Sequence, residues 1–417
     1  MTANRGQTAV TPTSASALPR VVLAAVALLA AWAAGPAADR AGEHEAQPAA
    51  QSRAQLPTQS AAQIQTRPPA QAQTQSRPPA QPQAQAQSPA QPAPSPSANV
   101  RALTGARTRI VWVQGDGTDP LAAGDRLTLW GLDTDDGRGE RAILGTRGSY
   151  VKPLMTRTGD RIVFSTRPDP GPPEIFVVNW DGSGLARLAA GFALDVWRDP
   201  ATGREWVYVG TNNRQYDFAK VVRMPLDDPT VRELVWDRTM VSSDTFQVSA
   251  DGRSAAGMFP WPATGIAVLP NKSWRTLGDG CWTSLTDIGG TLFWRFDQGH
   301  RNLTLVDLTN DWQWVVPINR VPDFHGAEVY HPRWSNHPRF MVMSGPYTLG
   351  GPFANKVRAG GTQAEIYLGR FSADFTGVEG WARVSRNTGG DAFPDVWVDR
   401  DRCPYPSRRT GRIGPPP

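Results

Sequence analysis

The stretch that decides the fold reads GDRIVFSTR at residues 159–167 and EIFVVNWDGSGLARLAAG at residues 174–191. The first part is an apolar run that follows a Thr-Gly-Asp turn, and the second is an apolar run that leads into the turn Asp181–Gly184. Short runs of β-branched and aromatic residues bounded by Gly and Asp predict strands joined by tight hairpins. With Tyr150–Met155 before them and Ala186–Leu188 after them, these runs predict one four-stranded antiparallel sheet.

The same pattern recurs along the chain beyond Val100, with no apolar stretch of helical period and length. Evenly spaced short strands with such turns indicate a sandwich, a barrel or a propeller, and an internal repeat decides for the propeller. The weaker copies are ALDVWRDPATGREWVYV (193–209), FQVSADGRSAAGMF (246–259), SLTDIGGTLFWRF (284–296) and HPRWSNHPRFMVM (331–343).

The strongest copy resembles a TolB-type, WD40-like repeat, in which a P-x-W-S-P-D-G turn precedes one strand and N-x-D-G-S-G closes the next. The residues at the motif positions are Pro153, Met155, Gly159, Asp160, Asn179, Asp181, Gly182 and Gly184. The resemblance covers most of residues 108–398 and is specific for architecture. It implies a TolB-like β-propeller and a scaffold role in a complex of the cell envelope.

The number of blades follows from counting strands. Five four-stranded units begin near Ser149, Phe192, Ser242, Cys281 and Ala327. Ahead of them only three strands are found, within residues 109–144, and Asp391–Val398 is a single strand at the far end. We predict that this last strand completes the first blade, because closure into six blades removes the exposed sheet edges of a linear array.

The first hundred residues cannot belong to the propeller. Val21–Ala34 is unbroken apolar sequence, so residues 1–38 are either a cleaved signal peptide or a retained single-span anchor. Residues 39–100 are rich in Ala, Gln, Pro and Ser, which predicts a disordered linker. Arginine before the apolar stretch indicates that the rest is exported, to the periplasm or the cell surface.

Charge excludes nucleic acid as a partner. The formal net charge is +5, but the first hundred residues carry six Arg against three acidic residues. The remaining basic residues are scattered among nearly as many acidic ones and form no phosphate-binding stripe. We expect a monomeric propeller domain over residues 101–402 and a disordered tail over residues 403–417.

Strand polarity sorts the loops into two faces. The loops between second and third strands share one face with the connections between blades, and this loop-rich face is the expected ligand-binding face. It includes the long loop Tyr347–Thr362. The candidate ligand-binding residues on it are Asn213, Asp244, His300, Arg301, His325, His331, Lys356, Arg358 and Asp391.

Two functions from different classes are open at this stage. The first is a non-enzymatic module that binds a protein, peptide or glycan, needs no cofactor and contains no catalytic residues. The alternative is a metal-dependent lyase- or hydrolase-like enzyme acting on a polysaccharide, with one divalent ion held by His300, His325 and His331. The chain has no nucleophile elbow, phosphate-binding loop, dinucleotide fingerprint or haem-attachment motif.

Two further expectations concern packing. Trp197, Trp334 and Trp397 fall at equivalent positions near the ends of inner strands, where they should pack between blades. Cys281 and Cys403 should be free thiols, because the strand polarity places them on opposite faces.

Overall fold

A computed structural model describes residues 94–116, 122, 124–167, 171–214, 217–286, 292–322, 324, 326–347 and 364–407 of the chain, without the side chains of residues 213 and 214. The signal or anchor segment and nearly all of the predicted linker lie outside this part. None of the helices formed by the described residues has the length and apolar character needed to cross a membrane.

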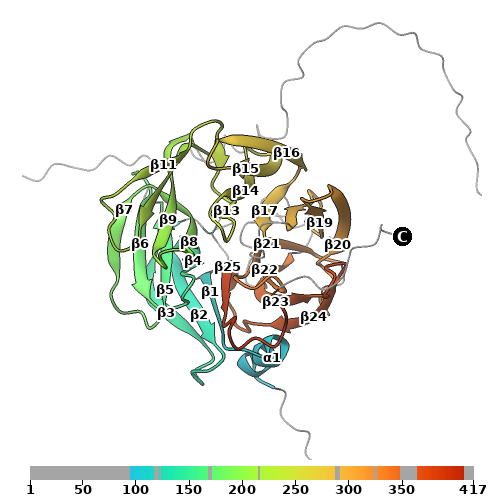
Figure 1. Cartoon of the computed structure of the whole chain (residues 1–417). Coiled ribbons are helices and arrows are strands. Elements are labelled where there is room, and N and C mark those ends of the chain that lie inside the picture. The colour runs from blue at the N-terminus through green and yellow to red at the C-terminus, as the bar shows by residue number, and fades with distance from the viewer. Residues whose placement is uncertain are drawn as a thin grey trace, which may run out of the picture. The chain divides into compact units, whose positions relative to one another are not determined.

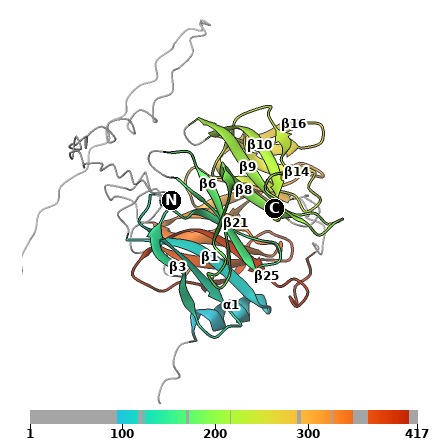
Figure 2. The same ribbon diagram turned by 90° about the vertical axis from the view of Figure 1, so that its left-hand side faces the viewer.

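Six antiparallel sheets are arranged in a ring (Figure 1). We number the blades by their sheets: blade 1 is β25-β1-β2-β3, blade 2 is β4–β7, blade 3 is β8–β11 with the additional β12, and blades 4, 5 and 6 are β13–β16, β17–β20 and β21–β24. Figure 2 shows the same ring from the side. The six-bladed β-propeller expected from the repeat is therefore confirmed.

The strands are short, and each blade runs from an inner strand at the channel to an outer strand at the rim. The inner strands are β25 (Gly390–Val398), β4 (Val151–Met155), β8 (Phe192–Arg198), β13 (Phe246–Val248), β17 (Cys281–Leu285) and β21 (Glu328–Trp334). The second strands are β1 (Thr108–Gly115), β5 (Arg161–Thr166), β9 (Glu205–Arg214), β14 (Ser254–Met258), β18 (Leu292–Phe296) and β22 (Phe340–Tyr347).

The third strands are β2 (Leu127–Asp133), β6 (Glu174–Asn179), β10 (Asp217–Pro225), β15 (Ala263–Val268), β19 (Asn302–Asp307) and β23 (Glu365–Phe371). The outer strands are β3 (Glu140–Gly148), β7 (Ala186–Ala190), β11 (Glu233–Trp236), β16 (Ser273–Asp279), β20 (Trp312–Pro317) and β24 (Val378–Arg383). The short β12 (Val241–Ser242) pairs with the start of β10 and was not foreseen.

The ring is closed by the last strand of the chain. β25 pairs antiparallel with β1 from Thr108↔Val398 to Gly115↔Gly390, so the two ends of the propeller share one sheet. This confirms the predicted completion of blade 1 by the C-terminal strand. The pairing hydrogen-bonds the inner edge that β1 would otherwise expose.

Two predicted tryptophans hold neighbouring blades together through the turns of the repeat. Trp397 at the end of β25 donates its indole N–H to Arg157 O of blade 2 at 3.0 Å and covers Gly159. Trp197 at the end of β8 repeats this contact on blade 4, donating to Ala250 O at 3.0 Å and covering Gly252. Both glycines have a positive φ, so the repeat needs glycine there for backbone and space together.

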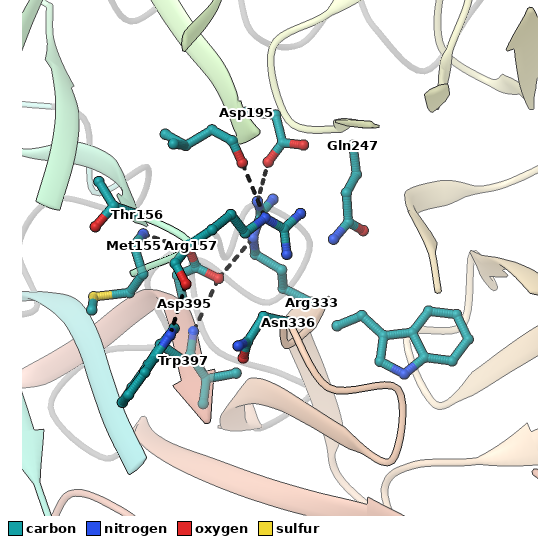
Figure 3. A pocket seen from close by; sticks show the side chains of 12 residues that line it. Met155, Thr156, Arg157, Asp195, Gln247, Arg333, Asn336, Asp395 and Trp397 are labelled. Atoms are coloured by element: carbon teal, nitrogen blue, oxygen red, sulfur yellow. Dashed lines mark hydrogen bonds and ion pairs between the residues drawn. The ribbon is translucent and has the colours of Figure 1, made fainter. Parts of the chain in front are cut away.

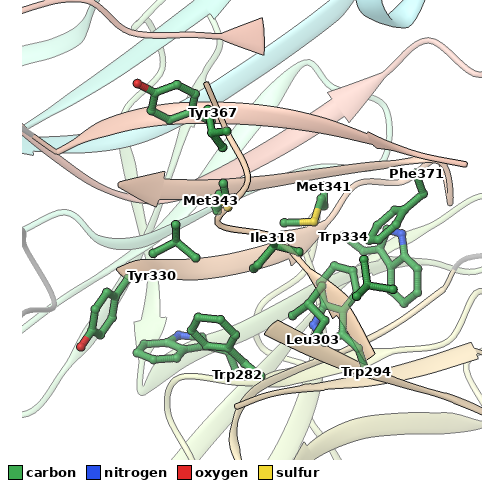
Figure 4. Packing of buried hydrophobic residues seen from close by; sticks show 14 of the residues in the cluster. Trp282, Trp294, Leu303, Ile318, Tyr330, Trp334, Met341, Met343, Tyr367 and Phe371 are labelled. Atoms are coloured by element: carbon green, nitrogen blue, oxygen red, sulfur yellow. The ribbon is translucent and has the colours of Figure 1, made fainter. Parts of the chain in front are cut away.

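The third tryptophan packs in a different way. Trp334 stacks on Trp294 of blade 5 with ring centroids 4.1 Å apart and donates its indole N–H to Pro338 O in its own hairpin (Figure 4). These two rings lie in the largest apolar cluster, which joins blades 5 and 6. Similar clusters fill the spaces between the other blades, so the core lies between sheets and not within one sheet.

The propeller unit begins and ends outside its expected limits. The helix α1 (Pro96–Thr104) starts within the segment assigned to the linker, is capped by Ser95 and buries Val100. At the other end Cys403 and Tyr405, assigned to a disordered tail, pack against the apolar cluster of blades 1 and 6. Apolar side chains on both sides of the expected limits at 100 and 402 are thus packed against the blades. Cys281 and Cys403 are not joined by a disulfide bond, as expected.

Candidate functional site

The inner strands have bulges that turn side chains toward the channel. Register shifts occur in five of them, and the extra residues in four have a positive φ: Lys152, Trp282, His331 and Phe393. A bulge bends its strand and changes the direction of the next side chains. The polar residues that follow these bulges therefore meet in the channel.

These residues form a ring, in which each blade is bonded to the next. The side chains of Asp395, Asp195, Gln247 and Ser284 accept the backbone N–H of Met155, Val248, Leu285 and Trp334, which lie on blades 2, 4, 5 and 6. Asn336 likewise accepts from Val398 N at 2.7 Å, and Arg157 Nε donates to Val196 O at 3.3 Å. All six junctions between blades are thus hydrogen-bonded at this level.

Arg333 of blade 6 spans the ring. Its Nη2 lies 2.7 Å from Asp195 on the opposite blade 3, and its Nε lies 2.9 Å from Asp395 on blade 1. The side chains of these two acids are 1% and 7% exposed, and that of Arg333 is 16% exposed. Burial lowers the pKa of Arg333, but the two carboxylates outweigh burial and raise it. The charged triad makes a rigid floor at mid-channel.

A small cavity lies directly on this floor (Figure 3). Besides the triad it is lined by Gln247 and by residues at the ends of inner strands, among them Arg157, Asn336 and Trp397. Its volume is about 10 Å³, which is room for about one water molecule. Because the inner strands run away from the loop-rich face, this cavity opens on the opposite face from the expected one.

This channel site was not predicted from the sequence. One signal was available, since Lys152-Pro153, His331-Pro332 and Phe393-Pro394 repeat at the bulges and the second residue after the bulge faces the channel in Arg333 and Asp395. The pairing of Arg333 with Asp195 joins residues far apart in the chain, and no spacing indicates it.

Near the loop-rich face, one buried amine links three blades. Lys152 Nζ of blade 2 donates to Leu194 O at 3.1 Å and to Ser243 O at 2.9 Å, and the residue is 6% exposed. Burial, and then the charge of Arg333, lowers the pKa of Lys152 to about 7, against the opposing carboxylates of Asp244, Asp195 and Asp395. The candidate residue Asp244 therefore lies at the same end of the channel.

Another candidate, Asp391, is fully buried at the start of β25. Its carboxylate accepts from Gln114 Nε2 and from Asn387 Nδ2, each at 3.1 Å. Burial raises the pKa of Asp391 to about 7, and the neighbouring carboxylate of Glu365 adds to this effect. A carboxyl group with a strongly raised pKa is a common feature of functional sites, although structural networks also produce it.

The predicted histidine site is described only in part. His300 has Nδ1 3.4 Å from Glu328 Oε2, while His331 is buried with Nδ1 2.8 Å from Ser344 Oγ. Both rings contact Trp282, at centroid distances of 6.1 and 5.3 Å. Burial lowers the pKa of His300, with Glu328 opposing it. The described residues include no group of three or more His, Cys, Asp or Glu suited to a metal ion, and His325 is not among them.

The other candidates are distributed as follows. Arg301 follows His300 in the same loop and donates from Nε to Gly326 O at 3.1 Å. Asn213 lies near the end of β9, but its side chain is not described. Lys356 and Arg358 lie outside the described residues with most of the long loop. The metal hypothesis and these ligand contacts therefore stay predictions.

The comparisons with known proteins concern the fold. No protein-family model matches the chain, and no curated protein matches it. Among solved structures it is similar to TolB from Acinetobacter baumannii, with 15% identity over 72% of this chain and 70% of that chain and a TM-score of 0.46. A putative TolB from Agrobacterium tumefaciens has 12% identity over 70% of this chain and 98% of that chain, with a TM-score of 0.44.

A nidogen/laminin complex shows a similarity of the same order, with 7% identity over 71% of this chain and 100% of that chain and a TM-score of 0.45. The six-bladed β-propeller itself follows from the strand pairings of the chain. Similarity at this level carries no argument about activity. The function has to be argued from the channel itself.

Proposed function

We propose that the chain is an exported binding module that recognises a protein, peptide or glycan partner in the cell envelope. The observation that carries the proposal is the polar ring at mid-channel. It bonds every blade to the next and fixes the side chains beneath an open mouth, and a preorganised surface loses little entropy on binding. Export is supported by the sequence of residues 1–38, and the resemblance of the repeat to TolB supports a place in the cell envelope.

A photo-crosslinking residue introduced into the full chain, in cells that produce it, tests this function. Position 158 lies in the exposed turn beside Arg157 at the channel mouth, and position 230 lies in an exposed turn at the rim of blade 3. Both residues are threonines, which makes them matched sites. We expect a discrete cross-linked partner in the extracytoplasmic fraction from position 158 only. Absence of any product, or equal products from both positions, would contradict the proposal.

The alternative, a metal-dependent enzyme acting on a polysaccharide, is a separate proposal. It is supported by His300 and His331 lying against the same tryptophan near the loop-rich face. Metal analysis of the purified full chain tests it: one divalent ion per chain, lost in a His325→Ala variant, is expected for the enzyme.

A further inference from the structure

The polar ring brings donors and acceptors from different blades together around the channel. Asp395, Asp195 and Ser284, on blades 1, 3 and 5, contribute acceptor oxygens that bond to other groups of the ring. Blades 2, 4 and 6 bring N–H donors to the cavity, those of Arg157, Gln247 and Arg333. Several of these N–H donors have no acceptor in the ring.

Gln247 has a free donor although it is almost fully buried. Its Oε1 accepts from Ser284 Oγ and from Leu285 N, which fixes the orientation of the amide. Its Nε2 has no hydrogen-bond partner among the described residues, and the residue is 3% exposed. In Figure 3 the amide nitrogen lies on the side of the cavity. The N–H of this amide lines the cavity, so an incoming acceptor can form a hydrogen bond with it.

The two arginines add further donors without protein partners. Arg157 uses Nε for Val196 O and makes no ion pair with the described residues, so both of its terminal nitrogens are available. Arg333 uses Nε and Nη2 for Asp395 and Asp195 and leaves Nη1. Both guanidinium groups reach the centre of the cavity in Figure 3. Two guanidinium groups that converge in this way repel each other, and the carboxylates of Asp195 and Asp395 offset this repulsion.

The charges in the cavity limit the class of anion. Arg157 and Arg333 are matched by Asp195 and Asp395, so the site has no excess positive charge for a phosphate dianion. Planar guanidinium and amide donors suit a planar acceptor group. The cavity has room for about one water-sized atom, so one oxygen of such a group enters it while the rest of the group stays in the mouth.

From these donors we infer that this cavity binds a single carboxylate group of the partner, held by Arg157, Gln247 and Arg333. The inference rests on the proposed binding function and names its ligand chemistry. An acidic side chain, a chain terminus and an acidic sugar all present such a group.

Calorimetric titration of the purified full chain tests the carboxylate site with three probes. They are N-acetyl-L-aspartic acid N-methylamide for an acidic side chain, N-acetyl-L-alanine for a chain terminus and D-glucuronate for an acidic sugar. Their neutral counterparts are N-acetyl-L-asparagine N-methylamide, N-acetyl-L-alaninamide and D-glucose. We expect at least one acid to bind at one site per chain, about tenfold or more tightly than its neutral counterpart. The acid that binds most tightly identifies the source of the carboxylate group.

Variants assign the binding to this cavity. Gln247→Glu keeps the acceptor for Ser284 and Leu285 but replaces the free donor by a negative charge, and Arg157→Gln removes the unpaired guanidinium. Each substitution should weaken the binding of the acid probe at least tenfold. Arg198→Gln is the matched control, since Arg198 lies on the same face of blade 3 and also donates from Nε to a carbonyl, that of Gly203. Should Gln247→Glu fail to fold, the binding measured for Arg157→Gln still decides, because Arg157 is partly exposed.

The carboxylate site is overturned if no acid binds more tightly than its neutral counterpart, or if both variants bind the acid like the wild-type chain. The broader function fails separately. If a cross-linked partner at position 158 persists in Gln247→Glu, the proposed binding function stands and the carboxylate site is contradicted. If the acid binds normally but no partner is cross-linked, the proposed binding function is contradicted.

Discussion

At the residue scale, the turn glycines show how local and tertiary demands coincide. Gly159 has φ 75°, and a Cβ built on it would lie 2.4 Å from the Trp397 ring of blade 1. The repeat motif identified Gly159 as a turn residue, because Thr-Gly-Asp between two apolar runs requires a left-handed position. That a tryptophan from the far end of the chain covers this glycine was not visible in the motif.

Gly159→Ala therefore combines two costs, which a matched glycine separates. Gly139 has a similar φ of 69° but no atom within 4 Å of a built Cβ. Gly139→Ala should cost about 1–2 kcal/mol for backbone strain alone. Gly159→Ala should cost a further 1–3 kcal/mol, roughly, because Trp397 must move. Urea unfolding of both variants measures the difference, and equal losses would show that the contact with Trp397 adds nothing.

At the scale of elements, β25 closes the ring and contains a buried acid, Asp391, as its second residue. The groups that face Asp391 are Ser385 and Asn387 before β25, Gln114 of β1 and Glu365 of β23. The carboxylate of Glu365 pairs with Arg383 of β24. Asn387 also donates to Glu140 of β3. Three strands thus bring carboxylates to one asparagine.

The pH dependence of stability reports this acid. The pKa of Asp391 is about 7 in the fold, above its usual range, so the folded chain holds this proton more tightly than the unfolded chain. The resulting stability is full below about pH 4 and is lost as the pH rises to 7. Relative to the wild type, Asp391→Asn should gain about 2 kcal/mol in unfolding free energy between pH 5 and pH 7.

The measurement is urea unfolding at those two pH values. The exposed Asp401→Asn serves as the control and should follow the wild type. An Asp391→Asn variant with the same pH dependence as the wild type would mean that the buried acid titrates as it does in the unfolded chain.

At the scale of the whole molecule, the propeller depends on the joining of its ends. A chain that stops at Gly389 lacks β25, which supplies Asp395 for Arg333 and Trp397 for Gly159. We expect it to lose native packing and to aggregate through the free edge of β1. A chain that stops at Ser407 retains every described contact and should match the full chain. Size-exclusion chromatography and near-UV circular dichroism distinguish these outcomes, and a monomeric, native-like chain without β25 would contradict the closure argument.

The repeat, the number of blades and the closing strand could be predicted from the sequence alone, because period-2 apolar runs and Gly-Asp turns are local signals that recur at regular spacing. The position of the channel site could not. Arg333, Asp195, Asp395 and Gln247 are single polar residues within different strands, and only the ring geometry makes them neighbours. Their spacing along the chain has no period, and the cavity that they line lies away from the face expected to bind a ligand. Burial gives these residues their energetic weight, and burial is a property of the closed ring.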